Sequence, residues 1–299
     1  YPTEQFPFAD APQRDVHTGA EGGLLDVGDS RGTTPKIFYI NSSTEYWNRG
    51  AALTHTDVDG KEDLAVHESV RIYHFAGTQH GAAELPTEPD ALPGNPVEFR
   101  LGHRALLQAL DAWVRAGVEP PPSGYGRVAE GTLVDLAGMA FPFLPGMPLP
   151  SVHRRPRRLD HGPDWDKGVI GAEPPGVGRE YAALVPAVDA DGNEVAGIRL
   201  PEVAAPLGTF VGWRLRSEAL GASWAMVGLQ GGWLPFAATE SDREAGDPRS
   251  AIAACYRDRE DYVSCAREAA LELVDRRLLL ARDLALVAER DEHLAGARQ

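Results

Sequence analysis

An acid and a histidine occupy matching positions after two similar stretches of this sequence. Glu45 lies five positions after Ile40, and His80 lies five positions after Phe75. A carboxylate beside an imidazole is the orienting half of a nucleophile–histidine–acid triad, because the acid holds the imidazole in the tautomer that can take a proton from a nucleophile. The pair therefore indicates general-base chemistry, provided that the fold brings the two side chains together.

The stretches before Glu45 and His80 predict β-strands. Residues 36–41 and 70–75 are short, rich in β-branched and aromatic residues, and bordered by turn-forming residues. If the two strands are parallel neighbours, they end at the same edge of the sheet, where open α/β sheets bind ligands. We therefore expect Glu45 and His80 to lie within hydrogen-bonding distance of each other.

A structural alternative exists for Glu45. Ser42, Ser43 or Thr44 could cap a short helix, and Glu45 would then complete the cap at the positive end of the helix dipole. The placement of His80 favours a function, because the glycines around it let the backbone turn sharply and project the imidazole. The matched pair leads us to prefer the catalytic interpretation of Glu45.

Three other histidines have structural interpretations. His74 lies within the second strand, so we expect it to be packed, and His67 should be exposed in the loop before that strand. His103 falls on the apolar stripe of a predicted helix, which is typical of a core histidine rather than a catalyst.

The sequence also resembles a known family. Four segments carry the resemblance: PKIFYINSSTEYW at residues 35–47, AGTQHG at residues 76–81, FPFADAPQ at residues 6–13 and the hairpin-like segment 181–216. They resemble the end of an α/β-hydrolase, and in particular a bacterial group described as α/β hydrolase domain proteins. The resemblance implies a serine hydrolase that acts on small-molecule carboxylic esters without a cofactor. Glu45 would be its acid and His80 its base.

The resemblance implies the fold class as well. We expect an α/β fold in which two parallel strands and a helix form the carboxyl-terminal part of an α/β-hydrolase sheet. A β-rich, irregular extension and a C-terminal helical hairpin would follow. Tyr46 and Trp47 come directly after Glu45 and could contact a substrate, with core packing as the alternative.

A convincing nucleophile is missing from the sequence. Ser30 lies in a G-x-S-x-G pattern, which requires a buried strand before the serine and a helix directly after it. Here the preceding run is weakly apolar, a strand follows, and only fifteen positions (45 − 30) separate Ser30 from Glu45, too few for a crossover helix. We therefore interpret the pattern as a chance match in a turn.

Three functional hypotheses follow from this gap. In α/β-hydrolases the serine precedes the acid and the acid precedes the histidine, so we expect the nucleophile upstream of Tyr1. This chain would then be the carboxyl-terminal part of a longer enzyme, inactive alone, with the missing amino-terminal part as its partner. The second hypothesis is a non-catalytic, hydrolase-derived binding module, and the third is a self-contained esterase that uses Ser30.

The chain divides into three predicted parts. A helix should begin at Pro96, capped by Asn95, and end at Gly117 before a run of prolines. A β-hairpin with an Asp-Gly turn should join two arms in the Gly- and Pro-rich middle of the chain. Residues 1–122 are predicted to form the hydrolase core. Residues 123–240 are the predicted β-rich extension, with hairpin arms at 181–188 and 194–200. Residues 241–299 are predicted to contain helices at 261–280 and 283–294.

Charge restricts the classes of partner. With 29 basic and 44 acidic residues, the net charge of −15 argues against nucleic acids and anionic membranes, which require a basic face. The one basic run, at residues 153–158, is interpreted as a solvated loop. The apolar segment 133–152 contains four prolines and Asp135, so we expect an extended segment rather than a membrane helix.

Metal binding and compartment have weaker signals. The turns at residues 55–60 and 189–193 lack the remaining ligands of a calcium loop, and no metal is expected. Cys255 and Cys265 could form a disulfide, which would indicate export, or could remain free thiols. The chain begins with Tyr1 but without the features of a signal peptide, which leaves a processed chain or a fragment as the interpretation and the compartment open.

Overall fold

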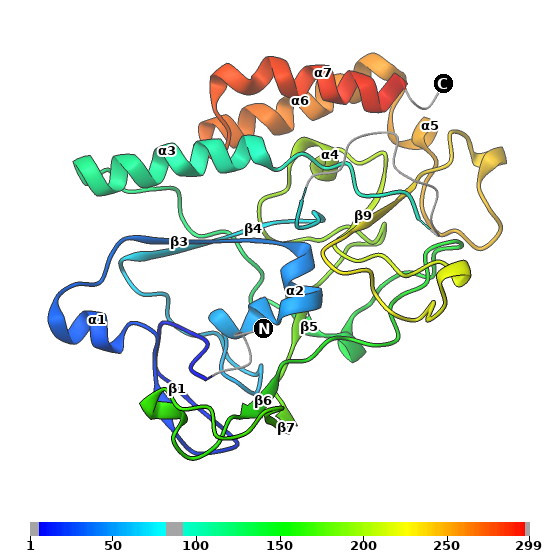
Figure 1. The fold of residues 1–299 in the computed structure, drawn as a ribbon. Helices are drawn as coiled ribbons and strands as arrows, with labels where there is room; N and C mark the ends of the chain where they lie inside the picture. Colours follow the sequence, from blue (N-terminus) through cyan, green and yellow to red (C-terminus); the bar gives the residue numbers. More distant parts are fainter. Residues whose placement is uncertain (1–5, 82–91, 297–299) are drawn as a thin grey trace.

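A computed structural model describes residues 6–81 and 92–296 of the chain (Figure 1). The strands are β1 (Gln13–Arg14), β2 (Glu21–Gly22), β3 (Ile37–Ser42), β4 (Val70–Phe75), β5 (Leu133–Asp135), β6 (Arg157–Asp160), β7 (Gly176–Glu180), β8 (Leu184–Pro186), β9 (Gly208–Val211) and β10 (Gly232–Pro235). The α-helices are α1 (Asp26–Arg31), α2 (Ser43–Arg49), α3 (Arg100–Ala116), α4 (Pro201–Ala204), α5 (Ile252–Cys255), α6 (Arg259–Asp275) and α7 (Leu284–Gly296). Short 3₁₀ helices lie at Ala51–Thr54, Leu136–Gly138, Trp165–Lys167, Glu218–Leu220, Glu240–Asp242 and Ala281–Asp283.

The parallel pair β3–β4 lies at the centre of the fold. Its register runs without interruption from Ile37 opposite Val70 to Ser42 opposite Phe75. The prediction of two adjacent parallel strands is therefore confirmed, and both strands end at the same edge.

The outer side of β4 is covered by two distant segments. The His74 amide donates to the carbonyl of Gly124 (2.8 Å), and the Ile198 amide donates to the carbonyl of His74 (2.6 Å). Both contacts are isolated parallel bridges. The middle part of the chain thus joins the sheet and covers an edge that two strands alone would leave bare.

The predicted hairpin of residues 181–188 and 194–200 forms only at its turn. Val188 and Glu194 make one antiparallel bridge around the turn, and the Asp189 amide donates to the carbonyl of Asn193 (2.8 Å). Beyond this point the arms separate: β8 pairs antiparallel with β5, and Ile198 pairs with β4. The correction arises because each arm gains a buried strand partner elsewhere, which periodicity within the hairpin does not reveal.

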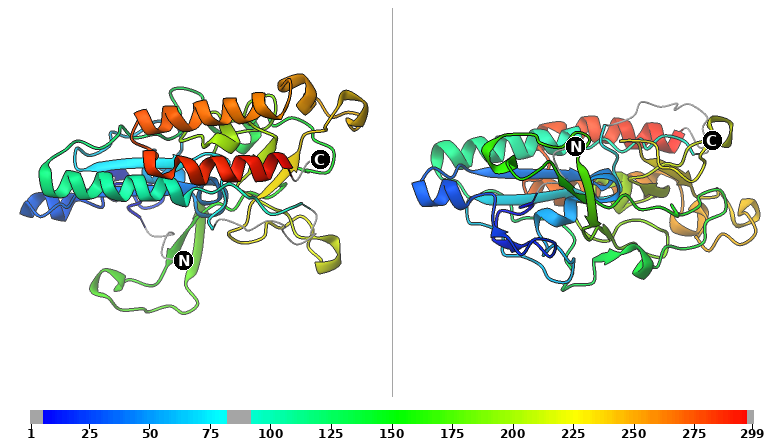
Figure 2. Two further views of the ribbon diagram at one scale, coloured as in Figure 1. Left: turned by 90° about the horizontal axis from the view of Figure 1, so that it is seen from above. Right: turned by 60° about the horizontal axis from the view of Figure 1, so that its bottom comes forward.

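The two faces of the sheet carry different layers (Figures 1 and 2). Tyr73 and Phe75 belong to a hydrophobic cluster that includes side chains of α3, α6 and α7, so these helices cover one face. His74 alternates to the opposite face, where its ring lies 4.7 Å from the ring of Tyr46 in α2. Helix α2, which carries Glu45, therefore packs on one face of the sheet, and α3, α6 and α7 pack on the other.

Helix α3 differs from its prediction at its start. It begins at Arg100 rather than Pro96, and Asn95 is buried instead of acting as its cap. The expected end at Gly117 is confirmed, with that residue in the left-handed conformation. Leu106 and Trp113 are buried and Gly102 lies against Phe75, whereas the adjacent Leu107 and Val114 are 69% and 62% exposed, so the buried stripe of α3 is narrow.

The C-terminal helical hairpin is confirmed as α6 and α7, which pack against each other. Arg104 of α3 pairs with the buried Asp283 just before α7 (3.1 Å). Cys255 and Cys265 are both free thiols, so the structure does not contain the disulfide of our first alternative. Over the described ranges, no helix combines the length and apolar character needed to cross a bilayer.

The basic run at residues 153–158 differs in part from the predicted solvated loop. Its end belongs to strand β6, which pairs antiparallel with β7, and Arg157 pairs there with Glu180 (2.5 Å). The β6–β7 segment extends away from the body of the molecule (Figure 2). Arg157 and Arg158 thus lie on a two-stranded ribbon with acidic partners, Glu180 and Asp15, whereas Arg154 and Arg155 lie in the loop before it, as predicted.

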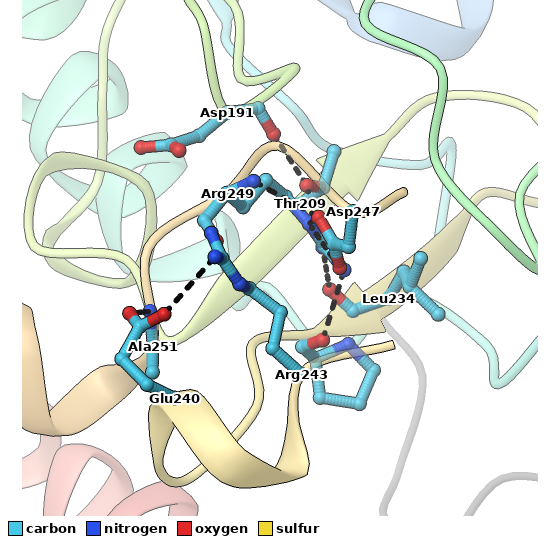
Figure 3. A network of polar contacts seen from close by, with 9 residues as sticks. Asp191, Thr209, Leu234, Glu240, Arg243, Asp247, Arg249 and Ala251 are labelled. Carbon is cyan, nitrogen blue, oxygen red and sulfur yellow. Dashed lines mark hydrogen bonds and ion pairs between the residues drawn. The ribbon is translucent and has the colours of Figure 1, made fainter. Parts of the chain in front are cut away.

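A buried arginine attaches the segment before α5 to the middle of the fold (Figure 3). Arg249 forms an ion pair with Asp247 (2.6 Å) and donates to Thr209 Oγ1 in β9 and to the carbonyl of Leu234 in β10. Burial works against ionisation of Asp247, but the hydrogen bonds from Arg249 outweigh it and lower the pKa of that carboxyl.

Candidate active site

Glu45 and His80 meet at the carboxyl edge of β3 and β4. Nδ1 of His80 lies 2.5 Å from Oε1 of Glu45, a hydrogen-bonding distance. The side chain of His80 is 57% exposed, whereas that of Glu45 is 18% exposed. The geometric prediction is confirmed: a mostly buried carboxylate orients an imidazole that faces the surface.

Glu45 also completes the cap of α2. Its Oε2 accepts from the Ser42 amide (2.7 Å) and the Ser42 hydroxyl (2.5 Å), which makes a capping box at the helix start. The structural and functional interpretations of Glu45 therefore coexist, because each uses a different carboxylate oxygen. The cap fixes the rotation of the carboxylate and leaves Oε1 to the imidazole.

The turn that carries His80 is buried and hydrogen-bonded. Gly77 has a φ of 63°, and its carbonyl accepts from Asn95 Nδ2 (2.6 Å). The Gln79 amide group bridges two other segments, donating to the carbonyl of Asn95 (3.1 Å) and accepting from the Gly231 amide (2.8 Å). The backbone before His80 is therefore fixed, while its side chain stays accessible.

Sequence reasoning missed both polar supports of this turn. Asn95 was expected at a helix cap, yet it also donates to the carbonyl of Val211 (3.1 Å) and accepts from the Val97 amide (3.0 Å). Gln79 lies in a Gly-rich stretch and has no pattern of its own. The sequence does show polar residues near the histidine that the turn projects. That signal does not identify the groups to which these residues hydrogen-bond.

Comparison with known families decides the assignment. A family model described as "Alpha/beta hydrolase domain" matches residues 10–289. The chain belongs to this α/β hydrolase family. Neither the curated proteins nor the solved structures gave a match.

Ser30 lies at the other edge of the sheet in this α/β hydrolase domain. It is an exposed residue of α1, and its hydroxyl donates to the carbonyl of Val27 (2.9 Å). Its neighbour Asp29 lies 3.4 Å from His67 Nε2, next to the amino end of β4. A six-residue strand such as β4 is roughly 20 Å long, so Ser30 is well beyond the reach of His80. Its local structure is a short helix rather than the expected turn.

Tyr46 and Trp47 are core residues of the domain. They are 0% and 1% exposed. The Tyr46 hydroxyl lies 3.0 Å from His55 Nε2, and the indole of Trp47 packs against Trp213 with ring centroids 5.8 Å apart. Their burial supports core packing, the alternative to the predicted substrate contact.

The other histidines differ in their surroundings. His74 is fully buried, as predicted, whereas His67 is partly buried by its contact with α1 instead of exposed. His103 packs on the rings of Phe75 and Phe99, and burial lowers its pKa. Within residues 6–81 and 92–296, no group of three or more His, Cys, Asp or Glu side chains is arranged to hold a metal ion.

Proposed function

We propose that this chain supplies the acid and the base of a serine hydrolase that cleaves carboxylic esters by a Ser-His-Glu triad. The observation that carries the proposal is the 2.5 Å contact between Glu45 and His80 in an α/β hydrolase domain. Glu45 accepts the hydrogen bond of Nδ1–H, so Nε2 of the neutral ring is free to take a proton. The attacking hydroxyl gives its proton to Nε2 as its oxygen bonds to the ester carbon, and the imidazolium returns the proton to the alcohol as the C–O bond breaks. Water, deprotonated by the same imidazole, then cleaves the acyl-serine and releases the acid.

The proposed nucleophile is a serine from a segment outside these 299 residues. Among residues 6–81 and 92–296, no serine, threonine or cysteine hydrogen-bonds to the His80 ring, and Ser30 lies at the opposite edge of the sheet. Within the same residues, β3 pairs with β4 alone. Its other edge can receive a strand that leads into a nucleophile elbow, with the oxyanion donors that the elbow brings. The proposed partner is therefore the amino-terminal part of the same enzyme.

The pair geometry favours an enzyme over a non-catalytic binding module. A module that had lost its chemistry would have no need for a fixed contact between Glu45 and an exposed imidazole. In this protein the contact is maintained by a capping box on one side and a buried turn on the other. The binding module is thus the outcome that the following experiment would reveal if the proposal fails.

The test is hydrolysis of a small chromogenic ester by this chain, the complete enzyme and two histidine variants of the complete enzyme. We expect little turnover by this chain alone, and turnover sensitive to serine reagents in the complete enzyme. His80→Ala should lower kcat on the order of a thousandfold or more, because the serine loses its base. His67→Ala is the matched control, since His67 also faces a carboxylate but at the other edge of the sheet.

Each outcome has a distinct meaning. Robust activity of this chain alone would overturn the external nucleophile. An unchanged rate in His80→Ala would overturn the assignment of the base. A complete enzyme that neither hydrolyses esters nor reacts with serine reagents would support the binding module instead.

A further inference from the structure

A second, buried carboxylate joins the two elements that carry the site. Glu194 is 3% exposed. Its Oε1 accepts from the hydroxyl of Ser43 (2.5 Å), and its Oε2 accepts from the amide of Gly77 (2.6 Å). Ser43 is the first residue of α2, two positions before Glu45, and Gly77 lies three positions before His80.

A buried imidazole faces the same carboxylate. His74 is fully buried in β4, and its Nε2 lies 3.2 Å from Oε2 of Glu194. Gly197 presses on the other side of the ring, since a Cβ built there would lie 2.8 Å from His74 Nδ1. His74 is thereby held against Glu194, and the carboxylate has three polar neighbours in a place without solvent.

A carboxylate in such a position requires a reason. Removing a charged group from water is costly unless hydrogen bonds and an opposite partner compensate, and an apolar residue of similar size would fill the space at lower cost. The two oxygens of Glu194 accept hydrogen bonds from two different elements, α2 and the turn after β4. They thus set the separation of these elements.

The separation matters because the contact at the site is short. A 2.5 Å contact between Glu45 and His80 is lost if α2 or the turn moves by an ångström. The first turn of α2 is held from another side as well, where Thr44 Oγ1 donates to the carbonyl of Gly212 (2.6 Å). Of these supports, Glu194 is the one that binds both the acid-bearing helix and the histidine-bearing turn.

We propose that Glu194 is a positioning residue that holds Glu45 and His80 in register, with His74 as its buried partner. The residue acts through the backbone of the two elements and not through contact with a substrate. Its effect on catalysis rests on the proposed function, whereas its effect on the His80 ring does not.

The first test reads the ring of His80 directly in the 299-residue chain. Long-range ¹H–¹⁵N correlation spectra, with His80→Ala for assignment, report which ring nitrogen carries the proton at a pH where the ring is neutral. We expect the Nδ1–H tautomer in the wild type. In Glu194→Gln the two elements should separate and the ring should shift toward the Nε2–H form that free imidazoles prefer.

Asp63→Asn is the matched control. Asp63 is a buried carboxylate that accepts two backbone N–H groups, from Val128 and Ala129, and it also joins two distant segments. The control should lose stability without any change at His80. If Glu194→Gln fails to fold, Ser43→Ala removes a single donor to Glu194 and should move the tautomer in the same direction by a smaller amount.

The second test is kinetic and uses the complete enzyme. Glu194→Gln should lower kcat about tenfold or more with KM nearly unchanged, since the base is misplaced while the binding surface persists. An unchanged His80 tautomer in folded Glu194→Gln and Ser43→Ala would overturn the positioning role. Full activity of His80→Ala would instead overturn the proposed function, and the spectra would still decide the role of Glu194.

Discussion

Single histidines in this protein show how burial separates structural from chemical roles. His80 is largely exposed beside Glu45, so its ring can exchange protons with a ligand. His55 is 1% exposed, and burial lowers its pKa to about 4. The Tyr46 hydroxyl meets His55 Nε2 at 3.0 Å, which suits a neutral ring that accepts the hydrogen bond. The same residue type therefore serves as a candidate base at one place and as a core polar group at another.

His55 should make the free energy of unfolding depend on pH. In the unfolded chain its pKa is about 6.5, and in the folded state it is about 4. Between these values the unfolded chain binds the extra proton, so stability is lost as the pH falls from about 6.5 to about 4. The loss should reach about 3 kcal/mol. Urea unfolding across this range should show a shallower pH dependence in His55→Gln, and an equal slope in both proteins would contradict the assignment.

At the scale of elements, the turn after β4 depends on one glycine. Gly77 adopts a left-handed φ of 63°, and a Cβ there would lie 3.1 Å from the carbonyl oxygen of Phe210. Its amide binds Glu194 and its carbonyl binds Asn95. The turn can therefore approach β9 closely and still satisfy its backbone polar groups.

Gly77→Ala should destabilise the protein more than a matched glycine substitution. Gly117 has nearly the same φ (65°), but a Cβ there meets nothing within 4 Å. Gly117→Ala should cost about 1 kcal/mol for the left-handed conformation alone. Gly77→Ala should cost about 2 kcal/mol or more, because β9 must also move. Chemical denaturation measures both, and equal losses would contradict the close approach to β9.

At the scale of the whole molecule, distant parts of the chain share one interior. The largest hydrophobic cluster takes residues from all three predicted parts, for example Tyr73, Phe210 and Leu273. This cluster crosses the predicted part boundaries at residues 122 and 240, so those boundaries rest on composition alone. Arg249 adds a polar connection, since it attaches its own segment to both β9 and β10.

Arg249→Lys should lower the stability of the whole fold. A lysine cannot reproduce the fork of hydrogen bonds to Asp247, Thr209 and two backbone carbonyls, and it would leave buried acceptors without donors. We expect a loss of about 2–4 kcal/mol in the free energy of unfolding. Arg257→Lys is the control, because Arg257 pairs with Asp261 at the surface, where solvent screens the pair, and should change stability far less than Arg249→Lys. Similar losses in both variants would contradict the structural role of the buried network.

The sequence by itself determined the features that depend on neighbouring residues. The two strands follow from short runs of β-branched and aromatic residues, and the end of α3 follows from Gly117. The capping box needs only Ser42 and Glu45, three positions apart, so its chemistry is local. The meeting of Glu45 and His80 was also predictable, because parallel strands of equal length end at one edge.

Only the tertiary structure decided the long-range partners. Glu194 is 151 positions from Ser43 and 117 from Gly77, and Asn95 is 116 positions from Val211. The tertiary structure also places Ser30 at the edge opposite His80, which agrees with the sequence context that marks its G-x-S-x-G pattern as a chance match. Periodicity and capping rules describe contacts within one element, whereas these partners are selected by which buried polar groups the whole packing leaves to be satisfied.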